Sequence, residues 1–185
     1  MVRYVKADVR YLPKIEALEN ACFTVDAFSR RRLRNLVVSQ HAIVLLAMDG
    51  DDVIGCTIGL TRKRVGYRES GVVGQNEKFK THDSGLTTRD SIVGRLYSIC
   101  VREDYRCRNI ATELLSWLED IFSTRGVERI TLEVREHNMP ARRFYEKHGF
   151  SEKDIITNYY RDGVNAVKME KCLKHSIEET ILTGS

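Results

Sequence analysis

The sequence contains little that would break or crosslink a folded chain. Its 185 residues include only 2 prolines, 1 tryptophan and 5 cysteines. The cysteines are odd in number and contain no Cys-x-x-Cys pair, so neither a disulfide framework nor a zinc site is expected. No run approaches the roughly 18 apolar residues of a membrane helix, and the first ten residues lack the basic-then-apolar layout of a signal peptide. We therefore expect a cytoplasmic protein with no metal and no membrane partner.

The charge balance is also modest. There are 30 lysines and arginines against 26 acidic residues, which gives a net charge of +4, and 42% of the residues are hydrophobic. This composition excludes a disordered chain and predicts one domain, residues 1–173, followed by a tail, residues 174–185. The basic run Arg30–Arg34 is read as a solvated helix face, so nucleic acid is not an expected partner.

The spacing of apolar residues predicts alternating strands and helices. A period of two indicates a strand and a period near 3.6 a helix. Residues 62–93 show neither period, which predicts a long loop. The predicted strands are 2–6, 42–48, 52–60, 95–101, 129–135, 155–160 and 165–171, and the predicted helices are 7–19, the segment around Arg30–Arg34, 110 to about 126, and 140–148.

The order of these elements predicts the fold class. It reads β-α-α-β-β-(long loop)-β-α-β-α-β-β, with Asp-Gly turns suited to hairpins at 49–50 and 162–163. The strand-helix-strand unit in the middle favours parallel pairing there, while the hairpins favour antiparallel pairing. We predict an α/β protein with a mixed sheet flanked by helices.

One turn is a candidate anion site. Residues 105–111 follow a predicted strand and open an amphipathic helix. Unpaired amides and the positive end of the helix dipole collect phosphate at such a position. A basic surface turn with an ordinary helix cap is the alternative reading.

This turn carries a resemblance to a known family. The segment V-R-E-D-Y-R-C-R-N-I-A-T-E-L-L (101–115) resembles the acetyl-CoA-binding turn of the GNAT superfamily of N-acetyltransferases, whose pattern is Arg/Gln-x-x-Gly-x-Gly/Ala. Arg106 and Ala111 fit its ends, whereas Asn109 stands where glycine is usual and Cys107 occupies a second position often filled by glycine. Asparagine tolerates a left-handed backbone, so we expect the site to survive this change.

The similarity continues in register through the C-terminal half. L-E-V-R-E-H-N-M-P-A-R-R-F-Y-E-K-H-G-F (132–150) and N-Y-Y-R-D-G-V-N-A-V-K-M (158–169) resemble the subgroup that acetylates protein amino termini, including ribosomal-protein alanine and archaeal N-terminal acetyltransferases. The resemblance implies the GNAT acyl-CoA N-acyltransferase fold, acetyl-CoA as the acetyl donor, and protein or peptide N-termini, ribosomal proteins among them, as substrates and partners.

The resemblance also assigns cofactor contacts residue by residue. A strand edge would hold the pantetheine arm, the turn would cradle the pyrophosphate, an asparagine would contact the cofactor beyond the next strand, and a tyrosine would lie beside the thioester sulfur. In that order the residues are Ile99, Cys100 and Val101; Arg106, Cys107, Arg108, Asn109, Ile110, Ala111 and Thr112; Asn138; and Tyr145.

Two residues are implied to be catalytic. Glu133 matches the acidic general base of the alanine-acetylating relatives, and Tyr145 would protonate the departing thiolate. Glu133 lies on the strand face opposite Leu132 and Val134, which is compatible with a cleft; a solvated glutamate is the alternative. Because an ordinary carboxylate near pKa 4.3 is a poor base at pH 7, proton removal would need a raised pKa or a water relay.

The resemblance implies substrate contacts in three places, the loop after the first helix, the central strand and the last hairpin. These candidates are Phe23, Val25, Tyr97, Tyr159 and Tyr160, for which core packing is the alternative. Relatives commonly have Asp-Gly-Glu-Asp-Ala where this chain has Asp-Gly-Val-Asn-Ala at 162–166, and this difference leaves the substrate open. A lysine side chain, a small amine, or CoA binding without catalysis are the alternatives on the same fold.

Overall fold

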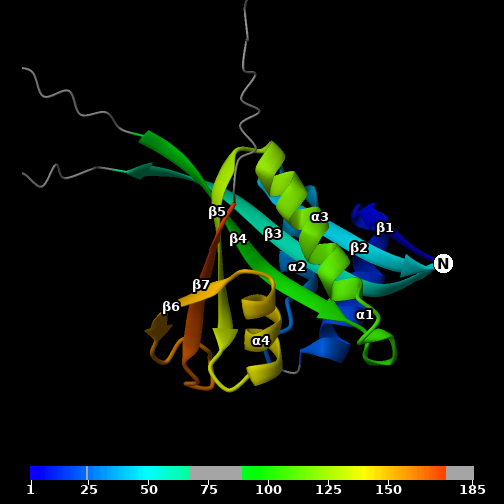
Figure 1. The fold of residues 1–185 in the computed structure, drawn as a ribbon. Coiled ribbons are helices and arrows are strands. Elements are labelled where there is room, and N and C mark those ends of the chain that lie inside the picture. The colour runs from blue at the N-terminus through cyan, green and yellow to red at the C-terminus, as the bar shows by residue number, and fades with distance from the viewer. Residues whose placement is uncertain (24, 67–88, 174–185) are drawn as a thin grey trace, which may run out of the picture.

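The protein is a seven-stranded sheet with helices on both faces (Figure 1). The computed structural model describes residues 1–23, 25–66 and 89–173. The strands are β1 (Val2–Lys6), β2 (Ala42–Asp49), β3 (Asp52–Gly66), β4 (Arg89–Val101), β5 (Val127–Arg135), β6 (Ser151–Ile156) and β7 (Ala166–Cys172). The α-helices are α1 (Leu12–Cys22), α2 (Arg30–Val38), α3 (Ile110–Thr124) and α4 (Met139–Lys147), with short 3₁₀ turns at Val9–Tyr11 and Glu103–Tyr105.

The sheet is mixed, as predicted. Its strand order is β1-β2-β3-β4-β5-β7-β6, and every neighbouring pair is antiparallel except β4 and β5, which are parallel. Helix α3 connects these two strands and crosses the face on which α4 also lies, while α1 and α2 cover the other face (Figure 1). Each face therefore has its own buried cluster.

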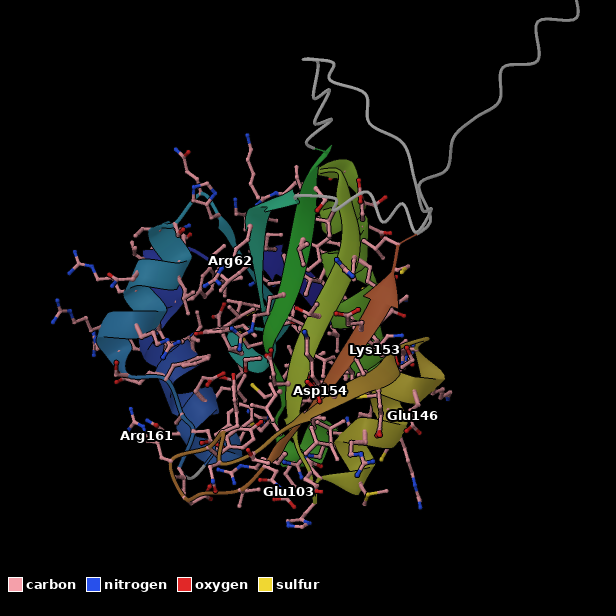
Figure 2. The ribbon with its side chains drawn as sticks, turned by 90° about the vertical axis from the view of Figure 1, so that its left-hand side faces the viewer. Arg62, Glu103, Glu146, Lys153, Asp154 and Arg161 are labelled. Atoms are coloured by element: carbon pink, nitrogen blue, oxygen red, sulfur yellow. The ribbon has the colours of Figure 1, made fainter. Side chains whose placement is uncertain are left out.

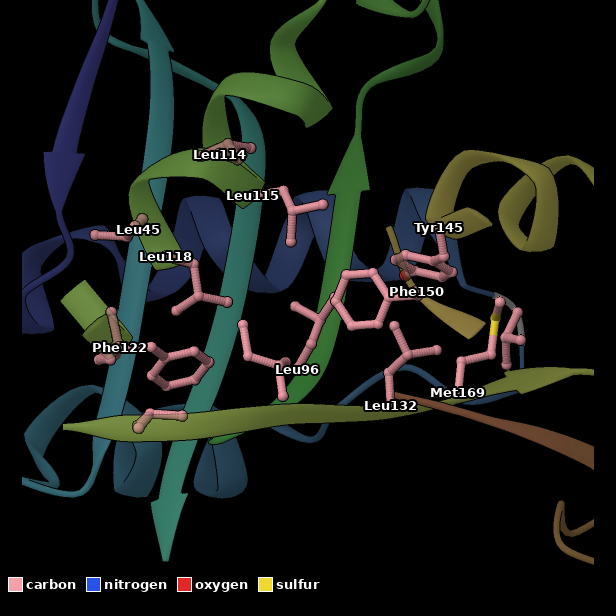
Figure 3. Close-up of a cluster of buried hydrophobic side chains, with 14 of the residues drawn as sticks. Leu45, Leu96, Leu114, Leu115, Leu118, Phe122, Leu132, Tyr145, Phe150 and Met169 are labelled. Atoms are coloured by element: carbon pink, nitrogen blue, oxygen red, sulfur yellow. The ribbon is translucent and has the colours of Figure 1, made fainter. Parts of the chain in front are cut away.

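Helix α3 supplies much of the core on its face. Leu114, Leu118 and Phe122 are fully buried against the sheet (Figure 3). Each such side chain contributes on the order of 1.5–3 kcal/mol through burial. The strands beneath accommodate the helix with glycines, since a Cβ on Gly59 would lie only 2.5 Å from Leu118 Cδ1. The close approach of α3 fixes where its N-terminus meets the end of β4.

Strands β4 and β5 pair over a short stretch only. Their parallel register runs from Ile92 opposite Val127 to Arg95 opposite Thr131. Beyond that point β4 continues beside β3 and β5 continues beside β7, so the two strands separate (Figure 1). Residues 96–101 of β4 thus have a strand edge that β5 does not occupy.

A β-bulge lies in the separated part of β4. Ile58 of β3 is opposite Ser98 and the adjacent Gly59 is opposite Leu96, which leaves Tyr97 as the extra residue. Tyr97 and Ser98 consequently both face α1 and α2, where Tyr97 stacks on Phe28 and Ser98 bonds Glu19. The bulge brings two polar side chains to the face that leads to the site described below.

The predicted element order is confirmed, but several bounds are wrong. The predicted helix 7–19 is the α-helix Leu12–Cys22, preceded by the 3₁₀ turn Val9–Tyr11, at whose start Asp8 accepts from the Arg10 N–H. The predicted loop 62–93 is partly strand, because β3 and β4 pair as far as Gly66 opposite Arg89; antiparallel pairing satisfies backbone groups whatever the side-chain pattern. Residues 67–88 and the predicted tail 174–185 lie outside the described residues.

A further correction concerns the strand predicted at 155–160. Strand β6 is Ser151–Ile156, and the chain then turns at Asn158, which has a φ of 51° and whose N–H donates to Asn165 Oδ1 at 3.0 Å. Tyr159 and Tyr160 therefore lie on a loop, and not on opposite faces of a strand.

Within residues 1–23, 25–66 and 89–173, none of the helices combines the length and the apolar character needed to span a membrane.

We expect Gly59→Ala to lower the free energy of unfolding by about 1–3 kcal/mol, because the added methyl group meets the buried ends of Leu118 and Phe122 at 2.5 and 2.7 Å. Gly55→Ala is the graded control, since its Cβ would come no closer than 3.1 Å to Leu114. Urea unfolding midpoints of the two variants test this, and a larger loss for Gly55→Ala would contradict the packing argument.

Candidate functional site

The turn between β4 and α3 has the backbone of an anion site. Cys107 and Asn109 have φ values of 58° and 64°, in the left-handed region. These are the two positions at which the family pattern usually has glycine, so the expectation that Asn109 supports the glycine conformation agrees with the backbone. The turn is built although neither residue is glycine.

The first amides of α3 are available to a ligand. The first hydrogen bond of the helix runs from the Glu113 N–H to Asn109 O at 3.1 Å, so the N–H groups of Ile110, Ala111 and Thr112 have no intrahelical acceptor. The Asn109 side chain makes no cap bond and instead donates to Glu113 Oε1 at 3.2 Å. The positive end of a 15-residue helix is thus left open.

Aromatic and basic side chains fix the turn in place. The Tyr105 hydroxyl donates to Asp49 Oδ2 at 2.9 Å, and the guanidinium groups of Arg102 and Arg108 lie 4.6 and 4.8 Å from its ring centroid. Arg106 donates to the carbonyl of Val101 at 3.4 Å. The turn is therefore tied to β2 and to the end of β4, and Arg106 and Arg108 precede the open amides in the chain.

The free edge of β4 leads to this turn. Cys100 is buried, while Ile99 and Val101 are partly exposed and pack toward α3. The backbone of these three residues pairs with β3 on one side only. A ligand lying along this edge could bond to it as an added strand does, ending at the amides of Ile110 to Thr112.

Glu133 is held by an arginine that sequence reasoning missed. Arg95 Nη2 and Nε lie 2.7 and 2.9 Å from Glu133 Oε2, and only 13% of the Glu133 side chain is exposed. Oε1 has no hydrogen-bond partner among the described residues. Arg95 also donates to the Tyr159 hydroxyl at 2.7 Å. Glu133 is therefore a positioned carboxylate in the gap between β4 and β5.

Tyr145 lies on the α4 side of the same opening. Its side chain is buried beside Phe150 (Figure 3), and burial raises the pKa of its phenol, with smaller contributions from Tyr160 and Cys100. Its hydroxyl makes no hydrogen bond within the described part of the chain. A phenol in this state stays protonated at neutral pH, and its raised pKa also makes it a weaker acid than an exposed tyrosine.

Two predicted cofactor residues also have structural partners. Asn138 is the N-cap of α4, where its Oδ1 accepts from the Ala141 N–H at 3.2 Å and its amide nitrogen remains for a ligand. Thr112 Oγ1 contacts His148 Nε2 at 3.1 Å, which links α3 to α4. His148 itself follows the last residue of α4, as expected for a cap residue.

Arg135 joins the two loops that flank the C-terminal end of β5. It lies 2.7 Å from Asp26 on the α1–α2 loop and 2.8 Å from Asp162 on the β6–β7 loop. Its guanidinium also lies 4.2 Å from the Tyr160 ring centroid. In Figure 2 the β6–β7 loop, with Arg161 labelled, extends across the end of the sheet toward the α1–α2 segment. These loops form one wall of the opening.

The predicted substrate residues are only partly brought together. Tyr159 and Tyr160 form an edge-to-face pair 5.1 Å apart, and burial raises the pKa of Tyr160 to about 12. Tyr97 stacks on Phe28 at 5.2 Å beneath the α1–α2 loop. Phe23 packs into the cluster under α1, whereas Val25 is 55% exposed.

A buried glutamate behind β4 was also missed. Glu19 of α1 is 1% exposed, and its Oε1 accepts from Ser98 Oγ at 3.0 Å. Its Oε2 is buried and has no hydrogen-bond partner among residues 1–23, 25–66 and 89–173. Burial raises the pKa of this carboxyl. Nearby, the Cys22 thiol has its pKa lowered to about 7 by its contact with Cys100.

These missed residues differ in the signal that they leave in the sequence. Glu19 continues the buried stripe of Ile15 and Leu18, so a charged residue on an apolar helix face would have marked it. Arg95 becomes visible only with the parallel register, which places it opposite Thr131, two residues before Glu133 and on the same face. The role of Arg135 can be recognised only once the positions of the α1–α2 and β6–β7 loops are known, and no local sequence pattern predicts those positions.

Comparison with known proteins agrees with this geometry. The family model described as the acetyltransferase (GNAT) family matches residues 12–150. The chain is 38% identical over 79 residues to the uncharacterized N-acetyltransferase MJ1530 of Methanocaldococcus jannaschii, which covers 42% of this chain and 51% of that protein. It is 40% identical over 81 residues to the N-alpha-acetyltransferase of Saccharolobus solfataricus, covering 43% and 48% respectively. The chain thus spans about half the length of these curated relatives.

A solved structure extends the likeness over the whole fold. The ribosomal-protein-S18-alanine N-acetyltransferase of Escherichia coli superposes with a TM-score of 0.72 at 21% identity, covering 97% of this chain and 98% of that one. At this identity the likeness concerns the fold alone.

We expect Asn109→Gly to keep or slightly raise the free energy of unfolding and Asn109→Val to lower it by about 1–2 kcal/mol, because only the first is free of the left-handed penalty. Urea unfolding of both variants measures this. Ala111→Val, in the same turn of the helix, is the control for introducing a β-branched residue at a helical position. An Asn109→Val variant as stable as the wild type would contradict the backbone argument.

We also expect Glu19 to make stability depend on pH. A carboxyl whose pKa is raised above its ordinary value of 4.5 binds its proton more tightly in the folded chain. Its contribution is therefore full below that ordinary value and is lost as the pH rises through the raised pKa. Above pH 4.5, wild-type stability should therefore fall relative to that of Glu19→Gln as the pH rises through the raised pKa.

Urea unfolding at several pH values above 4.5 compares the two proteins. Glu16→Gln, on the same helix but paired with Arg30 near the surface, is the matched control. Parallel pH profiles for the wild type and Glu19→Gln would show that Glu19 does not titrate in this range.

Proposed function

Because the chain belongs to the GNAT acetyltransferase family, we propose that it transfers an acetyl group from acetyl-CoA to the α-amino group of proteins or peptides, in a ternary complex formed within a domain of residues 1–173. One observation carries the proposal: β4 and β5 separate beside the open N-terminus of α3, with Glu133 and Tyr145 bordering the gap. The cytoplasm remains the location predicted from the sequence.

The residues present fit acetyl-CoA as the donor. Three unpaired amides, flanked by Arg106 and Arg108, suit a pyrophosphate, and the one-sided backbone of Ile99 to Val101 suits the amides of a pantetheine arm. The amide nitrogen of Asn138 is available for a further contact. When bound, acetyl-CoA supplies an activated thioester.

The remaining chemistry is assigned to two side chains. The acceptor amine must lose a proton as its nitrogen forms the new bond to the acetyl carbon, and Glu133 Oε1 would receive that proton, directly or through one water, because Arg95 holds Oε2. As the carbon–sulfur bond breaks, the protonated phenol of Tyr145 would donate a proton to the thiolate. Each proton thus has a donor and an acceptor.

An α-amino group is favoured over lysine on energetic grounds. Deprotonating an α-amine of pKa about 7.8 at pH 7 costs about 1 kcal/mol, and deprotonating lysine costs about 4.6 kcal/mol. An α-amine therefore needs less help from the carboxylate that Arg95 positions. The names of the archaeal N-alpha-acetyltransferase and the S18-alanine enzyme point to the same acceptor class, with ribosomal proteins among the candidate substrates.

The test is transfer to peptides. The protein is incubated with acetyl-CoA and peptides that differ in their first residue and each contain one internal lysine, and mass spectrometry locates the acetyl group. We expect it on the α-amine. Acetyl groups confined to lysine would contradict the acceptor assignment, and CoA binding in calorimetry without any transfer would contradict catalysis.

We expect Glu133→Gln to lower kcat by about 100-fold or more and Tyr145→Phe by about 10-fold or more, with CoA affinity nearly unchanged, because general acid–base catalysis contributes on this scale. Steady-state kinetics and calorimetry measure the two effects separately. Glu128→Gln, exposed on the same strand, and Tyr11→Phe, on the other face of the sheet, are the matched controls. Wild-type rates for both active-site variants would remove the roles assigned to them.

A further inference from the structure

One cation beside the proposed acceptor site has no acidic partner. Arg32, near the start of α2, is exposed. It forms no ion pair with any carboxylate in the described part of the chain. The neighbouring charges are matched differently, since Arg95 pairs with Glu133 and Arg135 pairs with Asp26 and Asp162. Among the described residues, Arg32 and Arg161 on the β6–β7 loop are thus both without an acidic partner, and Arg32 is the one that contacts Tyr97.

This arginine is held in place. Its guanidinium lies 5.0 Å from the ring centroids of both Phe28 and Tyr97, and it donates to the Tyr97 hydroxyl. Phe28 and Tyr97 stack on each other with an angle of 13° between their planes. Stacking on two rings restrains a side chain that is otherwise flexible and leaves the edge of the planar fork free to bind a carboxylate.

The position of Arg32 relates it to the acceptor. Arg95, which holds Glu133, lies 4.9 Å from the same Tyr97 ring centroid. Tyr97 therefore contacts both Arg95, which positions the proposed base Glu133, and Arg32. An extended peptide advances about 3.3–3.6 Å per residue. A chain whose α-amine lies at Glu133 and that extends over Tyr97 would therefore reach Arg32 at about its third residue.

Resting on the proposed function, we propose that Arg32, Phe28 and Tyr97 form a subsite for an acidic side chain at the second or third position of the acceptor peptide. A carboxylate bound through both of its oxygens would neutralise the charge of Arg32 without displacing its aromatic contacts. The enzyme would thus prefer amino termini that carry Asp or Glu as the second or third residue.

The experiment compares peptides that share one first residue and carry Glu, Gln or Lys at position two or three. We expect kcat/KM for the Glu peptide to exceed that for the Gln peptide by about three- to ten-fold and that for the Lys peptide to be lower still. The difference is modest because it comes from one ion pair, restrained in position and partly screened by solvent. The preference should weaken with added salt. Equal rates for Glu and Gln would overturn the subsite while leaving α-amino acetylation intact.

Variants of the arginine identify the residue responsible. Arg32→Gln should abolish the discrimination between Glu and Gln, and Arg32→Glu should reverse the order of Glu and Lys. Arg34→Gln, exposed on the same helix and with the same change in charge, is the control that should keep the preference. An equal loss of the preference for Glu in Arg34→Gln would overturn the subsite, because it would show that the general positive charge of α2 causes the preference.

Failure of the proposed function gives a different result. If no peptide is acetylated, calorimetry with the Glu and Gln peptides in the presence of CoA reads the subsite directly. Tighter binding of the Glu peptide that depends on Arg32 supports the subsite, and equal binding overturns it.

Discussion

The separation of β4 from β5 is the constraint on which the site depends. The parallel pairing ends at Arg95 opposite Thr131 because each strand then follows its other neighbour, β3 or β7. Backbone groups that a continuous sheet would consume are left along one edge. The same separation opens the gap into which Glu133 projects, so the donor and the acceptor would reach the reaction from two sides of one discontinuity in the sheet.

The helices keep this discontinuity open. Helix α3 packs closely on Gly59 and Gly94 at one end, and its other end brings unpaired amides to the tip of β4. Helix α4 fills the face beside β5 with Tyr145 and Phe144. Burial of apolar side chains thus positions polar groups that contribute little to stability themselves.

Much of the fold could be predicted because the periodic segments bury one face each. The alternation in β5 predicted a strand, and the apolar stripe of α3 predicted a helix. The position of that helix between two strands predicted their parallel pairing. The extension of β3 and β4 could not be found, since backbone pairing there continues under charged side chains. The end of β6 was predicted wrongly because the spacing of apolar residues does not reveal the positive φ at Asn158, where the chain turns.

The site divides in the same way. The turn and Glu133 follow from contiguous sequence, and the positive φ of Asn109 could be anticipated from the pattern in which it replaces glycine. Arg95, Arg135 and Arg32 act on partners 38, 109 and 65 positions away, so their roles depend on register and on loops that pack across the sheet.

The outer edge of the sheet has a consequence for how the molecule meets its own copies. Strand β6 is exposed from Ser151 to Ile155 and presents Glu152, Lys153 and Asp154 in succession, two of which are labelled in Figure 2. Any strand that added to this border would bring its side chains against charges on both faces of the sheet. The border is therefore a poor template for sheet growth, which protects the free edge of β6 from pairing with a strand of another copy.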